Sequence, residues 1–182
     1  MDKEEIMKAT GVIRRIDELG RIVVPKEIRK NLRIREGDSL EIFVGEDESI
    51  VLKKHSALRN IKDFASILVE AVYKDIKKSI MITDTDKVLA VAGKGKKDYA
   101  NKEISSTLAS SINRRENMLE RHRKMYQICD KEEEITYAIS TIIAEGDAVG
   151  AVFIFDKEEG VGETEKVVAS VIANFLAKHI EQ

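Results

Sequence analysis

A cluster of basic side chains surrounds Pro25, the only proline of the 182-residue chain. Within the stretch DELGRIVVPKEIRK, residues 17–30, Arg21 follows a turn, and Arg29 and Lys30 end a short helix-like run. The guanidinium fork of arginine matches phosphate oxygens, and arginines also reach base edges or a narrow minor groove. These residue types therefore favour binding of a phosphate backbone. The candidates for that role are Lys8, Arg14, Arg15, Arg21, Arg29 and Lys30.

Charge is segregated by sign along the first fifty residues. From Lys8 to Arg35 there are nine basic residues and three acids, which is a local net charge of +6. From Glu36 to Ile50 there are six acids and no basic residue. The whole chain carries a formal net charge of −2 at pH 7, but a polyanion responds to the local field of a surface rather than to this total. The net charge therefore does not exclude a nucleic-acid partner.

The remaining composition narrows the class of protein. Hydrophobic residues make up 43% of the chain and charged residues 35%, which allows one large or two small domains. The single cysteine, Cys129, excludes an intrachain disulfide and suits a reducing compartment. The chain starts with charges of both signs and no apolar signal segment. We expect a cytoplasmic protein without a metal ion, because no metal-site spacing connects His55, His122 and His179.

The first 55 residues predict a small unit of four short strands and one helix. Residues 8–16 and 21–24 are rich in β-branched side chains, and Pro25 suits the first position of a short helix. Two further strands, 39–44 and 49–54, flank an acidic hairpin turn. A unit of this size buries too little surface to be stable alone, and it has no disulfide or metal to compensate. We therefore expect an interleaved dimer.

The rest of the chain predicts an α+β domain. An amphipathic helix begins at about Ser56, with no flexible linker before it, and a last helix spans 163–181. Between them, strands alternate with helical segments, and the run AVGAVFIF, 148–155, is apolar enough for a central strand. The charged run 114–124 predicts a solvated helix or loop. The expected domains are residues 1–55 and 56–182.

Other candidate motifs in this second part are weak. The sequence GKGKKDY, residues 93–99, is not a phosphate-binding P-loop and predicts an exposed turn. Tyr126 and Cys129 could line a cavity, but such isolated residues more often pack in a core or face solvent. Nucleophilic catalysis needs a nucleophile placed against a base and an orienting group, and no such pairing is recognisable. We expect neither an enzyme nor a bound cofactor.

The stretch MKATGVIRRIDELGRIVVPKEIRKNLRIREGDSLEIFV, residues 7–44, resembles the swapped-hairpin DNA-binding domain of the AbrB family of bacterial transition-state regulators. Over its whole length, including GDAVGAVFIF and the final helix, the chain is similar to sporulation-stage regulators of that family. The resemblance implies an α+β fold class: a swapped-hairpin β-barrel formed by an intertwined dimer, joined by a helix to a GAF-like sensor domain. It also implies pairing of dimers into tetramers and a nucleoid-associated activator or repressor of transcription that binds double-stranded DNA. A small-molecule effector of the GAF-like domain is implied as a class only, without a named ligand.

The resemblance implies that four residues contact DNA, namely Arg14, Arg21, Arg29 and Lys30. It prefers Arg14 to Arg15, whereas strand alternation with Val12 and Ile16 favours Arg15 as the exposed residue. At position 30 the family pattern leads us to expect arginine. Lysine keeps the charge there but loses the bidentate fork.

Two other classes of protein stay open at this point. The same hairpin fold serves antitoxins of toxin–antitoxin pairs, in which the C-terminal part is usually a disordered acidic segment. Residues 56–182 instead show strong helix and strand periodicity. The second class is a stand-alone metabolite-binding protein whose N-terminal unit serves only for dimerisation. The salt dependence of DNA binding separates that class from a regulator.

Overall fold

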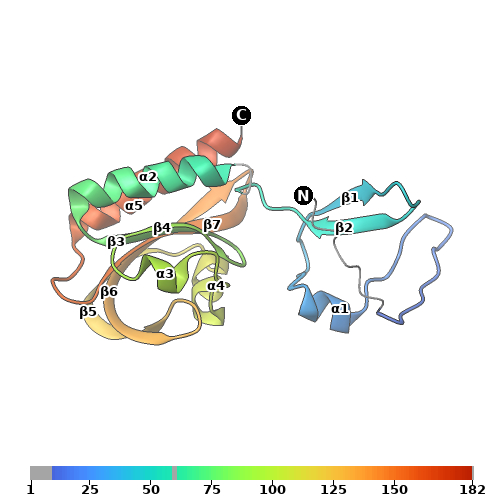
Figure 1. The fold of residues 1–182 in the computed structure, drawn as a ribbon, viewed down its shortest axis with the longest axis horizontal. Coiled ribbons are helices and arrows are strands. Elements are labelled where there is room, and N and C mark those ends of the chain that lie inside the picture. Colours follow the sequence, from blue (N-terminus) through green and yellow to red (C-terminus); the bar gives the residue numbers. More distant parts are fainter. Residues whose placement is uncertain (1–9, 59–60, 182) are drawn as a thin grey trace. The chain divides into compact units, whose positions relative to one another are not determined.

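The chain divides into two compact units, Met1–Lys54 and His55–Gln182. The structure is a computed structural model that describes residues 10–58 and 61–181, and the course of the chain is shown in Figure 1. Among the described residues, no helix is long and apolar enough to cross a membrane.

The N-terminal unit contains one helix and one hairpin. Helix α1 spans Lys26–Asn31, and strands β1 (Leu40–Val44) and β2 (Ile50–Lys54) pair antiparallel, with Val44 opposite Ile50. The backbone N–H of Gly45 donates to the carbonyl of Ser49 at 2.9 Å and closes the hairpin turn. The ion pair of Lys54 with Asp38, at 3.0 Å, ties the second strand to the loop that follows α1.

The strands predicted at 8–16 and 21–24 are not formed in the described part of this unit, residues 10–54. Residues 10–16 and 21–25 lie outside every strand and helix. A strand exists only where another strand accepts and donates its backbone hydrogen bonds, and the single chain supplies no such partner to these residues. The prediction of four strands was therefore wrong for the isolated chain.

No residue between 10 and 54 is buried. Large apolar side chains on the loop and on both strands remain accessible, which leaves this unit without a closed core of its own. They are Val12, Ile13, Ile16, Leu19, Ile22, Val23, Leu32, Ile42, Phe43, Val44, Ile50 and Leu52.

The C-terminal unit is built on a five-stranded antiparallel sheet in the order β4-β3-β7-β6-β5. Strand β3, which lies next to the edge strand β4, is wholly buried, and so is most of β7 in the middle of the sheet, as expected for inner positions. The strands are β3 (Ser79–Asp84), β4 (Val88–Ala92), β5 (Asn117–Gln127), β6 (Glu132–Ala144) and β7 (Asp147–Asp156).

Helices cover both faces of this sheet (Figure 1). On one face α2 (Lys62–Ile76) and α5 (Glu163–Ile180) lie side by side and bury an aliphatic core. On the other face α3 (Lys96–Tyr99) and α4 (Ser106–Asn113) cover a second core that contains five aromatic rings. The sheet is thus the middle of three layers.

Helix α2, the first helix of the C-terminal unit, begins at Lys62, six residues later than the predicted start at Ser56. Ser56 instead donates its hydroxyl hydrogen to Asp84 at 3.2 Å, and Leu58 is fully buried in the aliphatic core. A methyl group at Gly150 would lie 2.0 Å from the carbonyl oxygen of Thr83 and 2.6 Å from Leu58 Cδ1. Because Gly150 has no side chain, Leu58 can pack against the sheet there, and we call residues 56–58 the anchor of this unit.

The charged run 114–124 was predicted as a solvated helix or loop, and this prediction was wrong for residues 117–124. Residues 117–127 form the edge strand β5, which pairs with β6. An edge strand needs only one neighbour and leaves its other side to solvent, so a charged sequence is tolerated there. The register with β6 shifts between Glu120 and Lys124.

Candidate nucleic-acid interface

A turn from Asp17 to Arg21 organises the first basic element. The Asp17 carboxylate accepts the backbone N–H groups of Leu19 at 3.0 Å and Arg21 at 2.8 Å, and it pairs with Arg21 Nε at 2.7 Å. The backbone N–H and then the guanidinium of Arg21 hold the pKa of Asp17 below its ordinary value. Gly20 adopts a φ of 75°, which a side chain would strain.

Arg21 keeps donors available for a ligand. Its ion pair with Asp17 uses Nε, and within the described residues neither terminal nitrogen of the guanidinium makes a hydrogen bond. The side chain is 72% exposed. The turn thus fixes the stem of this arginine and presents the two terminal groups to solvent.

The second basic element is helix α1. Pro25 is its N-cap rather than its predicted first residue, and the Pro25 carbonyl accepts the N–H of Arg29 at 3.0 Å. Glu27 lies in the first turn, and Arg29 and Lys30 lie exposed in the last turn. Each charge matches the helix dipole, so the sequence stabilises the helix that presents the two cations.

The remaining candidates lie on the unpaired segment before the turn. Arg14 and Arg15 are both exposed, and Arg14 Nη1 donates to the neighbouring carbonyl of Ile13 at 3.0 Å. Because this segment is not part of a strand in the single chain, its geometry does not select between the two arginines. Lys8 lies outside the described residues. The assignment of all six basic residues stays a prediction.

Sequence reasoning missed the role of Asp17. It was counted as one of three acids that reduce the local charge, yet its carboxylate is the centre of the turn that holds Arg21. The signal was present in the sequence. An aspartate that is followed three residues later by glycine is typical of a turn closed by its own side chain.

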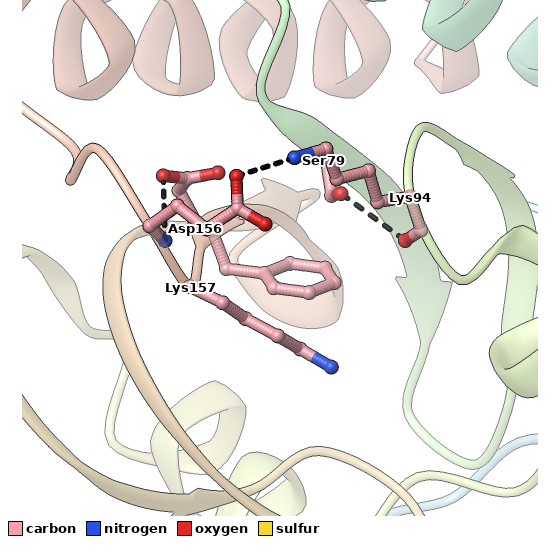
Figure 2. A pocket seen from close by; sticks show the side chains of 6 residues that line it. Ser79, Lys94, Asp156 and Lys157 are labelled. Atoms are coloured by element: carbon pink, nitrogen blue, oxygen red, sulfur yellow. Dashed lines mark hydrogen bonds and ion pairs between the residues drawn. The ribbon is translucent and has the colours of Figure 1, made fainter.

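The C-terminal unit contains a small cavity of about 30 Å³, lined by Phe155 and by polar or charged residues. Figure 2 shows Ser79 donating to the carbonyl oxygen of Lys94, at 3.3 Å, beside Asp156 and Lys157. Asp156 accepts the backbone N–H of Glu158 at 3.1 Å. A cavity of this size suits a single water molecule and is too small for a metabolite.

The aromatic core on the α3–α4 face is closely packed. The ring of Phe153 lies 5.1 Å from Tyr137 and 5.4 Å from Tyr126, and Tyr99 meets Phe155 edge to face at 5.4 Å. Tyr126 and Cys129, for which the sequence left a cavity-lining role open beside packing in a core, are both buried in this core.

Cys129 has the chemistry of a structural thiol. Burial raises the pKa of its thiol to about 11, so the group is protonated at neutral pH and is a poor nucleophile. Among the described residues, no three His, Cys, Asp or Glu side chains are arranged to hold a metal ion.

The family of the chain follows from its full-length similarity. A family model described as "Stage V sporulation protein T C-terminal, transcription factor" matches residues 60–181. Stage V sporulation protein T of Bacillus subtilis (strain 168) is 46% identical over 178 residues, which is 97% of this chain and 100% of that protein. The chain belongs to the stage V sporulation protein T family. This membership confirms the predicted transcription regulator and not the antitoxin alternative.

Each of the two parts of this stage V sporulation protein T family member has its own relatives. The transition state regulatory protein AbrB of Bacillus subtilis (strain 168) is 57% identical over 49 residues, 27% of this chain and 50% of that protein. A model described as "Antidote-toxin recognition MazE, bacterial antitoxin" matches residues 13–59. The crystal structure of the GAF domain from Acinetobacter phosphoenolpyruvate-protein phosphotransferase is 13% identical and covers 69% of this chain and 82% of that chain, with a TM-score of 0.55. The predicted α+β fold class with a GAF-like C-terminal part is confirmed.

Proposed function

We propose that the protein regulates transcription of sporulation-stage genes by binding double-stranded DNA through its N-terminal unit. The observation that carries the proposal is the presentation of basic groups by local structure: Arg21 on the turn held by Asp17, and Arg29 with Lys30 on the last turn of α1. The exposed residues Arg14 and Arg15 belong to the same proposed DNA-binding set, and Lys8 is included on the sequence alone. Membership of a family described as a transcription factor supports the same role.

We also propose that two chains interleave their N-terminal units. A second chain would supply strand partners to residues 10–16 and 21–24, and it would cover apolar side chains that one chain leaves accessible, among them Val12, Ile16 and Ile22. The dimer doubles the basic set about a two-fold axis, which matches the pseudo-symmetry of duplex DNA. Short basic elements contact phosphates and read groove shape more readily than a strict base code, so the target preference is degenerate and rich in A·T pairs.

The outer surface of α2 and α5 is the proposed contact between dimers in a tetramer. Its exposed stripe includes Ile67 at 71%, Val171 at 61% and Phe175 at 50%. Phe64 and Phe175 lie with ring centroids 5.9 Å apart, which makes the stripe continuous between the two helices. An apolar stripe of this kind marks a surface that a protein partner covers.

The C-terminal unit, residues 56–182, is the proposed sensor, and residues 1–55 form the DNA-binding domain. We propose that the protein acts by binding rather than by catalysis, because the family model that matches this unit is described as a transcription factor. The anchor, through Ser56 and Leu58, attaches the start of the sensor directly to the sheet of the same unit, with no flexible linker between them. A change in that sheet would then move residue 55 and with it the spacing of the two basic surfaces.

The salt dependence of DNA binding tests the proposed interface. With about eight phosphate contacts per dimer, the logarithm of the association constant should fall with the logarithm of salt concentration at a slope of about −7. Arg21→Ala combined with Arg29→Ala removes four of these contacts and should flatten the slope to about −4. A slope that stays unchanged would show that other residues contact the DNA.

The matched control replaces Lys74 and Lys97 by alanine. Both are exposed lysines of the C-terminal unit, so this variant loses two charges per chain as well. It should keep the slope of the wild-type protein. If the salt slope flattened equally in both variants, the effect would come from the overall charge of the protein, and this result would contradict the proposed interface.

A further inference from the structure

A second, larger hollow lies beside the edge strand β4. It has a volume of about 180 Å³ and is lined by side chains from α2, from β4 and from the segment around α3. Its apolar floor is the buried strand segment 89–91. Its polar lining consists of Lys62, Ser66, Lys96 and Asn101. We name this hollow the α2–β4 groove.

The α2–β4 groove carries positive charge without a carboxylate in its lining. Lys62 donates to the neutral side-chain oxygen of Asn101 at 2.7 Å and makes no ion pair with any residue that the structure describes. Lys96 pairs with Glu70, which lies outside the lining, and both of these side chains are about half exposed. One ammonium group of the groove is therefore not neutralised.

We propose that the α2–β4 groove binds a small anion, a phosphate- or carboxylate-bearing metabolite. The ammonium groups of Lys62 and Lys96 are the proposed charge partners of its anionic group. Because the oxygen of Asn101 accepts from Lys62, the amide NH₂ group of Asn101 is the donor left for the ligand. The floor formed by Leu89 to Val91 suits a short carbon body, and the volume limits the ligand to a small molecule.

The location of the groove connects it with the anchor of the sensor. Lys62 is the first residue of α2, four residues after the buried Leu58. The helix dipole adds positive potential at this end of α2, and Asp63 in the first turn offsets part of it. A bound anion would hold the first turn of α2 to the segment around α3. The assignment deepens the sensor role proposed above and rests on it.

The test is direct binding of two probe anions to the full-length protein without DNA. Broadening of the ³¹P resonance reports binding of inorganic phosphate, and saturation-transfer difference signals report binding of succinate, both at constant ionic strength set with chloride. Saturable binding of at least one probe is expected, and the two arms distinguish a phosphate ligand from a carboxylate ligand. Absence of saturable binding in both arms would overturn the proposal.

Substitutions then locate the binding. Lys62→Gln and Lys96→Gln should each lower the affinity for the bound probe by about tenfold or more, since each removes a charge-assisted hydrogen bond. Lys62→Arg, which keeps the charge, should retain binding and shows that a loss does not reflect misfolding. Lys97→Gln is the matched control, because it is an exposed lysine next to Lys96 that does not line the groove.

The variants decide whether the anion binds in the α2–β4 groove. Binding that Lys62→Gln and Lys96→Gln leave intact, or that Lys97→Gln weakens equally, would overturn the assignment to this groove. Because DNA is absent, the result is independent of the interface experiment above. Failure of the anion site therefore leaves the proposed DNA-binding function standing, and the reverse also holds.

Discussion

The carboxylate of Asp17 holds Arg21 twice, through the backbone N–H at 2.8 Å and through the guanidinium Nε at 2.7 Å. The first contact shapes the turn, and the second contact neutralises part of the charge that would meet a phosphate. One acid therefore has two opposite effects on the proposed interface. The two effects can be separated by substitution.

The amide in Asp17→Asn can still accept the backbone N–H groups, but it carries no charge. DNA affinity should rise by about twofold to tenfold, since a carboxylate close to the phosphates is removed. Asp17→Ala loses the turn as well and should bind more weakly than Asp17→Asn. Glu18→Gln, which removes the neighbouring acid, controls for net charge and should raise affinity less. Fluorescence anisotropy with a labelled duplex measures all three, and tighter binding by Asp17→Ala than by Asp17→Asn would contradict the role of the turn.

Gly150 should be intolerant of any side chain. The methyl group in Gly150→Ala would meet the Thr83 carbonyl oxygen at 2.0 Å and Leu58 at 2.6 Å. Because neither strand β3, which carries Thr83, nor the anchor can move away freely, we expect a loss of about 1–3 kcal/mol in the free energy of unfolding, or more. Chemical denaturation followed by circular dichroism measures it. Gly162→Ala is the control, because there the added methyl group would make only an ordinary contact at 3.5 Å, and it should cost much less.

Asp156 should make the stability of the C-terminal unit sensitive to acid. Burial favours the neutral acid, but the backbone N–H groups of residues 158–160 and the Lys78 ammonium outweigh it and hold the pKa of Asp156 below its ordinary value. A carboxyl whose folded-state pKa is depressed stabilises the fold above the unfolded-state pKa of about 4, and this contribution is lost as pH falls through the folded-state pKa.

Asp156→Asn should therefore be less stable at neutral pH and lose less stability on acidification below about pH 4. Denaturant midpoints measured across that range report both effects. The exposed acid in Glu132→Gln serves as the control and should leave the acid branch of the profile unchanged. A variant Asp156→Asn with the acid sensitivity of the wild-type protein would contradict the assignment.

The stripe on α2 and α5 should control assembly beyond the dimer. Val171→Glu combined with Phe175→Glu places two charges on the proposed contact, so the tetramer should dissociate to dimers while the C-terminal unit stays folded. Light scattering coupled to size-exclusion chromatography measures the mass. The control is Met125→Glu, since Met125 is a comparably exposed apolar residue at 54% on strand β5. Unchanged mass in the double variant, or equal dissociation in the control, would show that this stripe is not the contact.

Elements closed by nearby residues could be predicted from the sequence. The turn at 17–20, helix α1 and the hairpin of β1 and β2 all form through hydrogen bonds between residues close along the chain. The apolar strand β7 and the last helix were also recognised, because their patterns match their burial. The basic candidates could be named for the same reason, since charge and residue type are visible without a fold.

Contacts between distant residues were decided only by the tertiary structure. From the sequence, Leu58 was assigned to the start of an amphipathic helix. In the structure it is buried before that helix, because Gly150 on strand β7 has no side chain and leaves space for it. Lys62 and Lys96 are 34 positions apart, and only the packing of α2 beside β4 brings them to one groove. A residue's type determines what it can bind, whereas burial and strand pairing depend on partners that the chain brings in from far along its length.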